Sequence, residues 1–242
     1  MSDGSPLRDL AREAWLMDRA AEGDASLFLT SWEGPVVVLG YAQPPEDADL
    51  DWCRAEDVPV FRRLTGGTGV VHRRDLGVGL TIPANHPWAD GVVRSYDRFL
   101  EVLEPALNSL GSGVTRLAAP AHASRVRSPI CFLDQLSDTL VVDGKKAVGC
   151  AQTRRHGAVL IHAAILLGLD AALYSSVFGV AEEEVAAGLA PALRGVDWRE
   201  TADVLVGAFA DALRLEAEER PLAPMPPKYL APYADSKWAP VR

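Results

Sequence analysis

The sequence predicts a mixed α+β fold, in which a largely antiparallel sheet is flanked by helices. Short apolar runs typical of strands are interleaved with amphipathic helical stretches, without the regular strand–helix–strand rhythm that builds a parallel sheet. Two of the runs are joined by Asp143-Gly144, a dipeptide typical of a tight antiparallel hairpin. The chain has 242 residues and is 48% hydrophobic, which is enough for one domain with a sizeable core.

The first half of the chain is expected to begin with an amphipathic helix over residues 6–22, where Leu7, Leu10, Ala14 and Met17 recur at helical spacing. Short strands and one further helix follow, and the last of these strands enclose a glycine-rich turn. They are strands at 26–30 and 36–39 joined by a turn, a short helix at 49–57, and strands at 58–62, 69–72 and 77–82.

The second half is expected to begin with a helix over residues 90–111, which Pro105 kinks or ends early because proline lacks the helical N–H donor. The elements expected after it are strands at 138–142, 146–151 and 159–167 and helices at 171–178, 182–193 and 197–219. We assign residues 1–220 to a single domain. The proline-rich tail, residues 221–242, is expected to pack on that domain as an extended segment.

The composition argues against several classes of function. A net charge of −9 and a pI near 5.1 argue against a nucleic-acid partner, which requires a basic surface. The N-terminus does not resemble a signal peptide, and no apolar run reaches the about 18 residues of a membrane span. We therefore expect a soluble, cytoplasmic protein without a membrane partner. The three cysteines are widely spaced and form no Cys-x-x-Cys pair, so we expect neither a disulfide framework nor a metal site.

The most informative segment is residues 61–72, where two arginines precede three glycines and a histidine follows. Backbone N–H groups and guanidinium groups in such a turn can converge on a carboxylate, a phosphate or an acyl carbonyl. The alternative is an ordinary hairpin turn with surface arginines. The candidate ligand-binding residues are Arg62, Arg63, Gly66, Gly67 and Gly69.

Cys131 is a candidate nucleophile. It lies in Ser-Pro-Ile-Cys-Phe, in a segment that also contains Arg125 and Arg127. Nearby cations lower the pKa of a thiol and favour the reactive thiolate. The alternative is a small, buried and inert cysteine.

Two further candidates lie on later strands. Lys145 and Lys146 follow the Asp143-Gly144 turn on successive strand positions, so one of them should face inward. An inward lysine can bind an acyl carbonyl or a phosphate, or act as a base, whereas a solvated lysine pair is the alternative. His162 lies in an apolar strand, where it is either a satisfied core histidine or part of a site.

Four motifs occur in order along the chain. They are Arg62-Arg-x-Thr-Gly-Gly-x-x-Val-x-His72, Cys131-Phe132, Asp143-Gly-Lys-Lys-x-x-Gly-x-Ala-Gln-x-Arg154 and Leu160-x-His-x-x-Ile-Leu-Leu167. Together with Gly40-Tyr-Ala-Gln43 and Lys237-Trp238, they resemble the lipoate–protein ligase/octanoyltransferase family. The resemblance covers roughly residues 8–242.

The resemblance implies a catalytic domain related to biotin–protein ligases and class II synthetases. It also implies that an octanoyl or lipoyl group is attached to a lysine of a small acidic lipoyl domain, such as the glycine cleavage H protein or a dehydrogenase E2 component. By position, Lys146 would contact the acyl carbonyl and His72 would support the turn. The other residues that would border the acyl pocket are Arg63, Thr68, Gly69, Val70, Val71 and His162.

Two branches of the family differ in mechanism. In the transferase branch, octanoyl–acyl carrier protein passes its acyl group to a cysteine in a Cys-Phe motif, and no cofactor is required. In the ligase branch, free lipoate is activated with ATP and Mg²⁺ as an acyl-adenylate. Cys131-Phe132 favours the transferase, with Cys131 and Lys146 as the catalytic residues, because the Arg-Asn-Asp stretch typical of ligases is absent.

Some positions depart from the family pattern. They are Thr68 and Ala163 in place of glycines, Gly69 in place of an alanine, Cys150 in place of a serine, and Arg73-Arg74 between His72 and Asp75. Asp75 is therefore either displaced by an insertion or the family's acid is missing, and Cys150 becomes a rival nucleophile. A non-catalytic relative that binds a carrier domain stays open as a second alternative.

Overall fold

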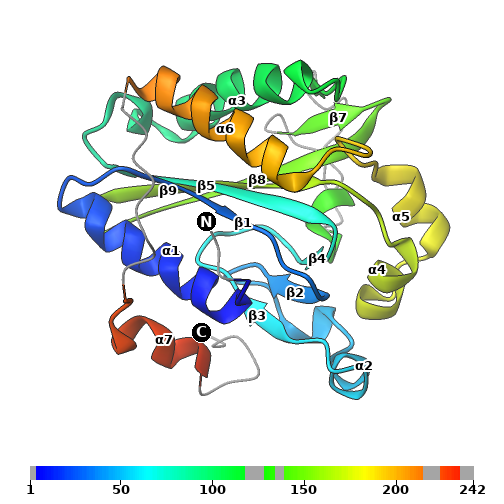
Figure 1. The fold of residues 1–242 in the computed structure, drawn as a ribbon. Coiled ribbons are helices and arrows are strands. Elements are labelled where there is room, and N and C mark those ends of the chain that lie inside the picture. Colours follow the sequence, from blue (N-terminus) through cyan, green and yellow to red (C-terminus); the bar gives the residue numbers. More distant parts are fainter. Residues whose placement is uncertain (1–3, 118–127, 134–138, 215–223, 235–242) are drawn as a thin grey trace.

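The computed structural model describes residues 4–117, 128–133, 139–214 and 224–234, which form two sheets surrounded by helices (Figure 1). The larger sheet has six strands, and all its neighbouring pairs are antiparallel. In spatial order they are β1 (Ser26–Thr30), β5 (Asp75–Pro83), β9 (Ala158–Leu166), β8 (Lys145–Arg155), β7 (Leu140–Val142) and β6 (Thr115–Arg116).

The smaller sheet has three strands. Its central strand is β2 (Val36–Leu39), which pairs in parallel with β3 (Val60–Arg62) and antiparallel with β4 (Val70–His72). The expected fold class, a mixed and largely antiparallel α+β architecture, is confirmed.

Helices cover the larger sheet on one side, and the smaller sheet lies on the other. Helices α3 (Val92–Ser109) and α6 (Trp198–Leu213) pack on the first face (Figure 1), where the buried rings of Phe99 and Phe209 have centroids 5.0 Å apart. Helix α1 (Pro6–Ala21) and the smaller sheet cover the opposite face. The space between the two sheets is where the candidate site lies.

Successive side chains of β9 point to opposite faces of the larger sheet. Ile161, Ala163 and Ile165 pack in the core beneath α3 and α6, whereas Leu160 and Ala164 pack on the side of α1 and the smaller sheet. His162 therefore points toward the space between the sheets, because successive side chains of a strand alternate.

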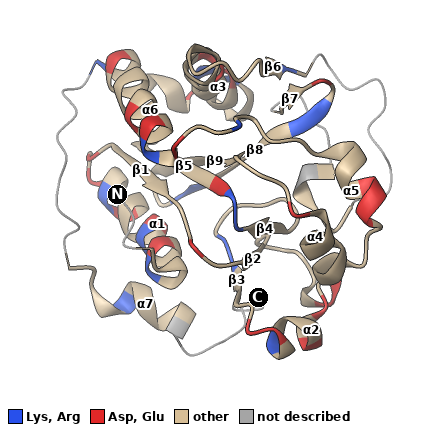
Figure 2. Cartoon of the chain, turned by 45° about the vertical axis from the view of Figure 1, so that its right-hand side comes forward, with Lys and Arg blue, Asp and Glu red and all other residues tan. Residues whose placement is uncertain are grey.

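The remaining helices lie at the periphery. Helices α2 (Leu50–Ala55), α4 (Ala171–Phe178) and α5 (Glu182–Gly188) lie at one end of the molecule, and α7 (Pro227–Ala234) packs against α1 (Figure 1). Acidic and basic segments are interspersed over the helices, with acidic residues at the start of α5 (Figure 2). Among the described residues, no helix is both long and apolar enough to cross a membrane.

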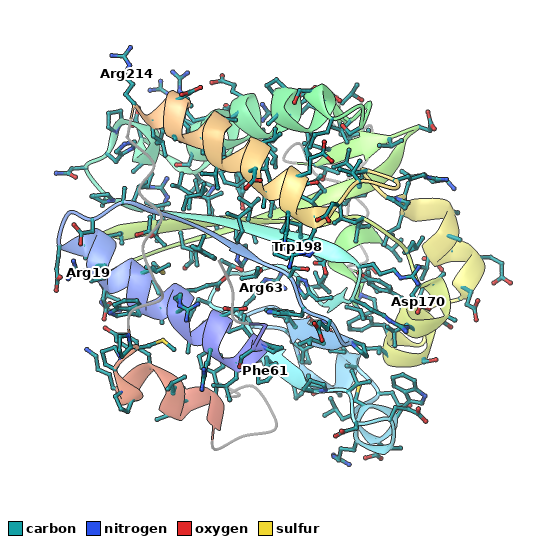
Figure 3. The ribbon with its side chains drawn as sticks, in the orientation of Figure 1. Arg19, Phe61, Arg63, Asp170, Trp198 and Arg214 are labelled. Carbon is teal, nitrogen blue, oxygen red and sulfur yellow. The ribbon has the colours of Figure 1, made fainter. Side chains whose placement is uncertain are left out.

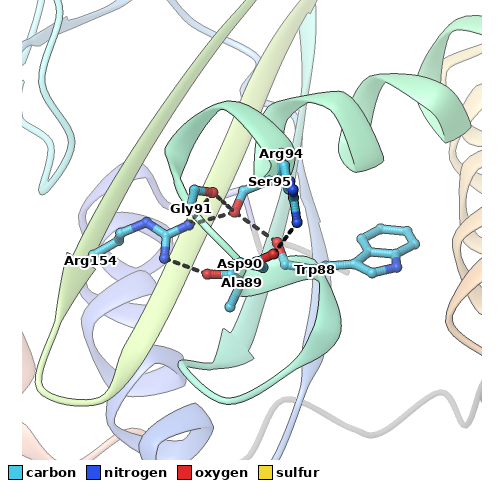
Figure 4. A network of polar contacts seen from close by, with 7 residues as sticks. All are labelled: Trp88, Ala89, Asp90, Gly91, Arg94, Ser95 and Arg154. Atoms are coloured by element: carbon cyan, nitrogen blue, oxygen red, sulfur yellow. Dashed lines mark hydrogen bonds and ion pairs between the residues drawn. The ribbon is translucent and has the colours of Figure 1, made fainter.

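A polar network attaches the start of α3 to β8 (Figure 4). Arg154 donates hydrogen bonds to the carbonyl oxygens of Ala89 and Gly91, each at 2.7 Å, and to Ser95 Oγ at 2.5 Å. Gln152 Nε2 donates to Val92 O at 2.8 Å. These two residues of the third motif therefore fix a helix on the far side of the sheet from the smaller sheet.

Most expected elements occur, but five differ in extent or partner. Strands β1 and β2 are not paired with each other, because β1 joins the larger sheet and β2 the smaller one. Pro105 is exposed, and α3 continues past it to Ser109 because its apolar face stays packed on the sheet. Helix α5 ends at Gly188, and α6 ends at Leu213, beyond which residues 215–219 lie outside the described part.

The expectation of an extended tail is wrong for residues 227–234, which form α7. Pro227 occupies the first helical position, where no N–H donor is needed. Tyr233 is buried against α1 and β2, and the Tyr229 hydroxyl donates a hydrogen bond of 2.5 Å to Asp18 Oδ2. Packing of these aromatic side chains outweighs the effect of the prolines.

Candidate functional site

A pocket lies between the two sheets and α1. It encloses about 630 Å³, part of which is open to solvent. Its apolar wall includes Leu10, Phe28, Trp32, Val38, Val70 and Ala164, and its polar groups include Asp9, Glu13, Arg63, His72, Cys131 and His162. A largely apolar cavity of this size with a few convergent polar groups is typical of a small-molecule site.

Two glycines of β5 let β1 contribute to this wall. Phe28 lies opposite Gly79 and Thr30 opposite Gly77 in the strand register. A Cβ on Gly79 would lie 2.0 Å from the Phe28 ring, and one on Gly77 would lie 2.2 Å from Thr30 Oγ1. The side chains of Phe28 and Thr30 therefore extend over β5, where they line the pocket.

The Arg63 side chain stabilises the glycine turn through hydrogen bonds (Figure 3). Its guanidinium donates to Thr65 Oγ1 at 2.8 Å, to Gly66 O at 2.7 Å and to Thr68 O at 3.0 Å. Gly67 has a φ of 92°, a left-handed conformation that favours glycine. The turn is thus folded around the Arg63 side chain and is not the surface hairpin of the alternative interpretation. Gly66, Gly67, Thr68 and Gly69 do not themselves line the pocket, contrary to our expectation.

Gly40, which directly follows β2, allows the glycine turn to pack closely against it. A Cβ on Gly40 would lie 1.9 Å from Gly67 O, a backbone atom that cannot move without displacing the turn. We expect Gly40→Ala to lower the free energy of unfolding by about 2–4 kcal/mol. Gly66→Ala is the matched control, because nothing lies within 4 Å of its added Cβ, and we expect a change within about 0.5 kcal/mol. Urea unfolding of both variants checks this, and equal effects would contradict it.

Arg62 lies outside the pocket lining, contrary to our expectation that it contacts the ligand. Its Nη1 donates to Gly40 O at 2.5 Å, to Gln43 O at 2.6 Å and to Tyr41 O at 3.2 Å. Burial lowers the pKa of the Arg62 guanidinium below its usual value. Its contacts fix the loop after β2.

The residues that follow in the turn differ in whether they line the pocket. Val70 lines the pocket, whereas Val71 packs in the core behind it. Thr68 is buried, and its Oγ1 has no hydrogen-bond partner among the described residues. A Cβ on Gly69 would lie 2.3 Å from the Phe178 ring, so only glycine fits there.

Cys131 lies beside this turn. Gly69 N–H donates to Pro129 O at 2.9 Å, and Cys131 N–H donates to Gly69 O at 2.8 Å, so the cysteine segment is attached to the start of β4. A Cβ on Gly67 would lie 3.6 Å from Cys131 Sγ and 2.6 Å from Arg63 Nη2. The thiol is therefore in the pocket wall, on the same side of the turn as the Arg63 guanidinium. Arg125 and Arg127 lie outside the described residues.

Lys146 reaches the same segment. Its side chain is buried, and Nζ donates a hydrogen bond of 3.0 Å to Cys131 O. Lys145, in contrast, lies closer to the surface and donates to Ala186 O at 2.8 Å. The expectation that one lysine of the pair faces inward is confirmed.

A β-bulge in β8 decides which lysine that is. Leu140 pairs with Val148, but Val141 pairs with Lys146, so Ala147 is an extra residue. Ala147 and Val148 both pack in the core under α3 and α6 despite being neighbours. Because the bulge interrupts alternation, Lys146 points to the opposite face, toward Cys131.

The other cysteines do not point into the pocket. Cys150 pairs with Ala163 on β9, and both side chains pack on the α3 and α6 side, so Cys150 lines the pocket through its backbone. The methyl group of Ala163 therefore leaves the pocket unobstructed. Cys53 is buried, and desolvation raises the pKa of its thiol to about 11. Cys131 is the best-placed nucleophile of the three.

His72 lines the pocket and is paired with Asp75. The distance between His72 Nδ1 and Asp75 Oδ2 is 2.5 Å, and the Trp32 ring packs edge-on against the imidazole at 4.9 Å. The alternative that the acid is missing is thus wrong. Arg73 and Arg74 lengthen the connection between β4 and β5, and Asp75 still pairs with the histidine.

His162 has partners on both ring nitrogens. Nε2 lies 2.8 Å from Thr65 Oγ1, and Nδ1 lies 3.0 Å from Glu13 Oε1. Glu13 Oε2 is buried and has no hydrogen-bond partner among the described residues. His162 is therefore hydrogen-bonded on both sides, as expected of a core histidine, and it also lines the pocket, as expected of a site residue.

The sequence interpretation missed Asp9 and Glu13 as pocket residues. Both are buried, and Asp9 Oδ2 accepts a hydrogen bond of 2.8 Å from Trp32 Nε1. A signal was present, because two carboxylates four residues apart flank the apolar stripe of α1.

An apolar pocket with a cysteine in its wall, and a buried lysine bound to that cysteine's carbonyl oxygen, can serve an enzyme that forms a covalent acyl intermediate. The chain belongs to the family of the lipoyl protein ligase A/B catalytic domain, whose model matches residues 5–210. The octanoyltransferase LipM of Kyrpidia tusciae is 32% identical over 268 residues, covering 97% of this chain and 94% of that protein. The octanoyltransferase LipM of Lysinibacillus sphaericus is 31% identical over 189 residues, covering 74% and 68%.

Solved structures share the fold. A lipoate-protein ligase A bound with ATP has a TM-score of 0.74 at 22% identity, covering 90% of this chain and 84% of that one. The bipartite lipoate protein ligase from Thermoplasma acidophilum, described with its E2 lipoyl domain, has a TM-score of 0.70 at 22% identity, covering 90% and 83%.

Proposed function

We propose that this protein is an octanoyltransferase that modifies a lysine of a lipoyl-domain protein through a thioester on Cys131. The observation that carries the proposal is the position of Cys131 in the wall of an apolar pocket, with Lys146 Nζ on its carbonyl oxygen. Relatives named octanoyltransferase at 31% and 32% identity support the choice of acyl group. The proposed setting is cytoplasmic and reducing, where the Cys131 thiol would stay available for acylation.

In the first half-reaction, the Cys131 thiolate attacks the thioester carbonyl of octanoyl–acyl carrier protein. A new carbon–sulfur bond forms, the bond to the carrier sulfur breaks, and the carrier thiolate leaves and takes up a proton. The octanoyl chain then occupies the apolar pocket. The thioester donor is already activated, so this step needs neither ATP nor Mg²⁺.

In the second half-reaction, the ε-amino group of the acceptor lysine attacks the Cys131 thioester. An amide bond forms, and the bond to Cys131 Sγ breaks, which regenerates the thiolate. The amine loses one proton, which passes to solvent. Lys146, whose Nζ binds the Cys131 carbonyl oxygen, would donate a hydrogen bond to the acyl oxygen as negative charge develops on it. The acceptor would be the glycine cleavage H protein or a dehydrogenase E2 component.

The test is intact-mass spectrometry of the enzyme after incubation with octanoyl–acyl carrier protein without nucleotide. We expect an added mass of one octanoyl group, which hydroxylamine removes because it cleaves thioesters. Addition of an apo lipoyl domain should move that mass to the domain. If the domain is modified only with free acid, ATP and Mg²⁺, the protein is instead an ATP-dependent lipoate–protein ligase, the function of the solved neighbour that binds ATP.

A further inference from the structure

The side chain of Gln43 connects the loop after β2 to the segment that carries Cys131. Gln43 is 2% exposed, and its Oε1 accepts a hydrogen bond from Gly40 N–H at 3.1 Å. Its Nε2 donates to Pro129 O and to Asp47 Oδ2, each at 3.0 Å. Both ends of the amide are thus satisfied within the protein, and one of the bonds crosses to a segment 86 residues away in sequence.

Pro129 is held from two directions. Its carbonyl oxygen accepts from Gln43 Nε2 at 3.0 Å and from Gly69 N–H at 2.9 Å. Two residues later, Cys131 N–H donates to Gly69 O at 2.8 Å. Gln43 and the start of β4 together therefore determine where the thiol enters the pocket wall.

Arg62 stabilises the backbone of the loop that carries Gln43. It binds the carbonyl oxygens of Gly40 and Gln43 at 2.5 and 2.6 Å, and so fixes the loop from which the amide extends. This gives the buried arginine a role although it does not line the pocket.

We propose that Gln43 is a positioning residue for Cys131: its amide holds the Pro129 carbonyl so that the thiol stays in the pocket wall. The inference rests on the proposed function, because it explains how the acyl-accepting cysteine is held. Gln43→Glu preserves length and the acceptor for Gly40 N–H, but it removes the donor to Pro129 and to Asp47 and places a second carboxylate beside Asp47. The cysteine segment should then detach from β4 about tenfold more often, because its buried hydrogen bond from Gln43 to Pro129 O is lost.

The experiment measures two rates in the full chain: octanoyl-thioester formation, and alkylation of each cysteine by iodoacetamide followed by peptide mass spectrometry. In Gln43→Glu we expect about tenfold slower thioester formation and about tenfold faster alkylation of Cys131, with Cys53 unchanged. The matched control is Gln152→Glu, whose amide also donates to a backbone carbonyl but at the start of α3. It should leave both rates at the wild-type values.

Two results would overturn the proposal. One is unchanged alkylation of Cys131 in a folded Gln43→Glu protein. The other is a parallel rise at Cys53, which would mean that the whole domain has loosened. Gln43→Met, which removes the donor without adding a charge, serves if the glutamate variant does not fold. If the wild type forms no thioester, the proposed function fails, yet the alkylation comparison still decides the role of Gln43.

Discussion

Replacing Cys131 by serine is expected to slow octanoyl transfer to a lipoyl domain by about 10³-fold or more, because a serine hydroxyl is not ionised at neutral pH. The substitution is nearly isosteric, and the backbone bond between Cys131 N–H and Gly69 O is unaffected. We therefore expect a folded protein with the wild-type melting temperature. Mass spectrometry of the lipoyl domain against time measures the loss.

Cys150→Ser is the matched control for this variant. The Cys150 side chain packs on the α3 and α6 side of the sheet, so transfer should stay within about twofold of wild type. The thioester should be absent from Cys131→Ser and present in Cys150→Ser. The reverse pattern would assign the nucleophile to Cys150 and contradict the geometry of the pocket.

Lys146→Met is expected to lower transfer by about 10²-fold or more, the range for loss of a proton-transfer group or of a donor to a developing oxyanion. The methionine matches the lysine side chain as far as Cε and leaves no buried charge unpaired, so the fold should persist. The bond to Cys131 O is lost as well, so both half-reactions should slow. Single-turnover measurements of thioester formation and of amide formation separate the two effects.

Lys145→Met provides the comparison. Its ammonium group binds Ala186 O near the surface, away from Cys131, so both half-reactions should proceed at wild-type rates. Equal losses in the two variants would indicate that the lysines act by attracting an acidic carrier protein. A high-salt assay would then reduce transfer in the wild type to the level of the variants.

Much of this protein could be predicted from local pattern. The Asp143-Gly144 turn predicted the hairpin of β7 and β8, and the apolar run at 159–167 predicted strand β9, since turn chemistry and strand period depend on neighbouring residues. The same applies to α1 and α3, whose apolar faces recur at helical spacing. Partners distant in sequence could not be predicted this way. The separation of β1 and β2 into different sheets is an example.

The candidate site shows the same division. The sequence by itself determined which chemical groups the chain carries and in what order: a glycine turn with arginines, then Cys131, Lys146 and His162. Only the tertiary structure decided where their side chains point. The bulge at Ala147 turns Lys146 toward Cys131, and the pairing of β8 with β9 turns Cys150 away. Such choices depend on non-local hydrogen bonds and packing, which residue spacing does not encode.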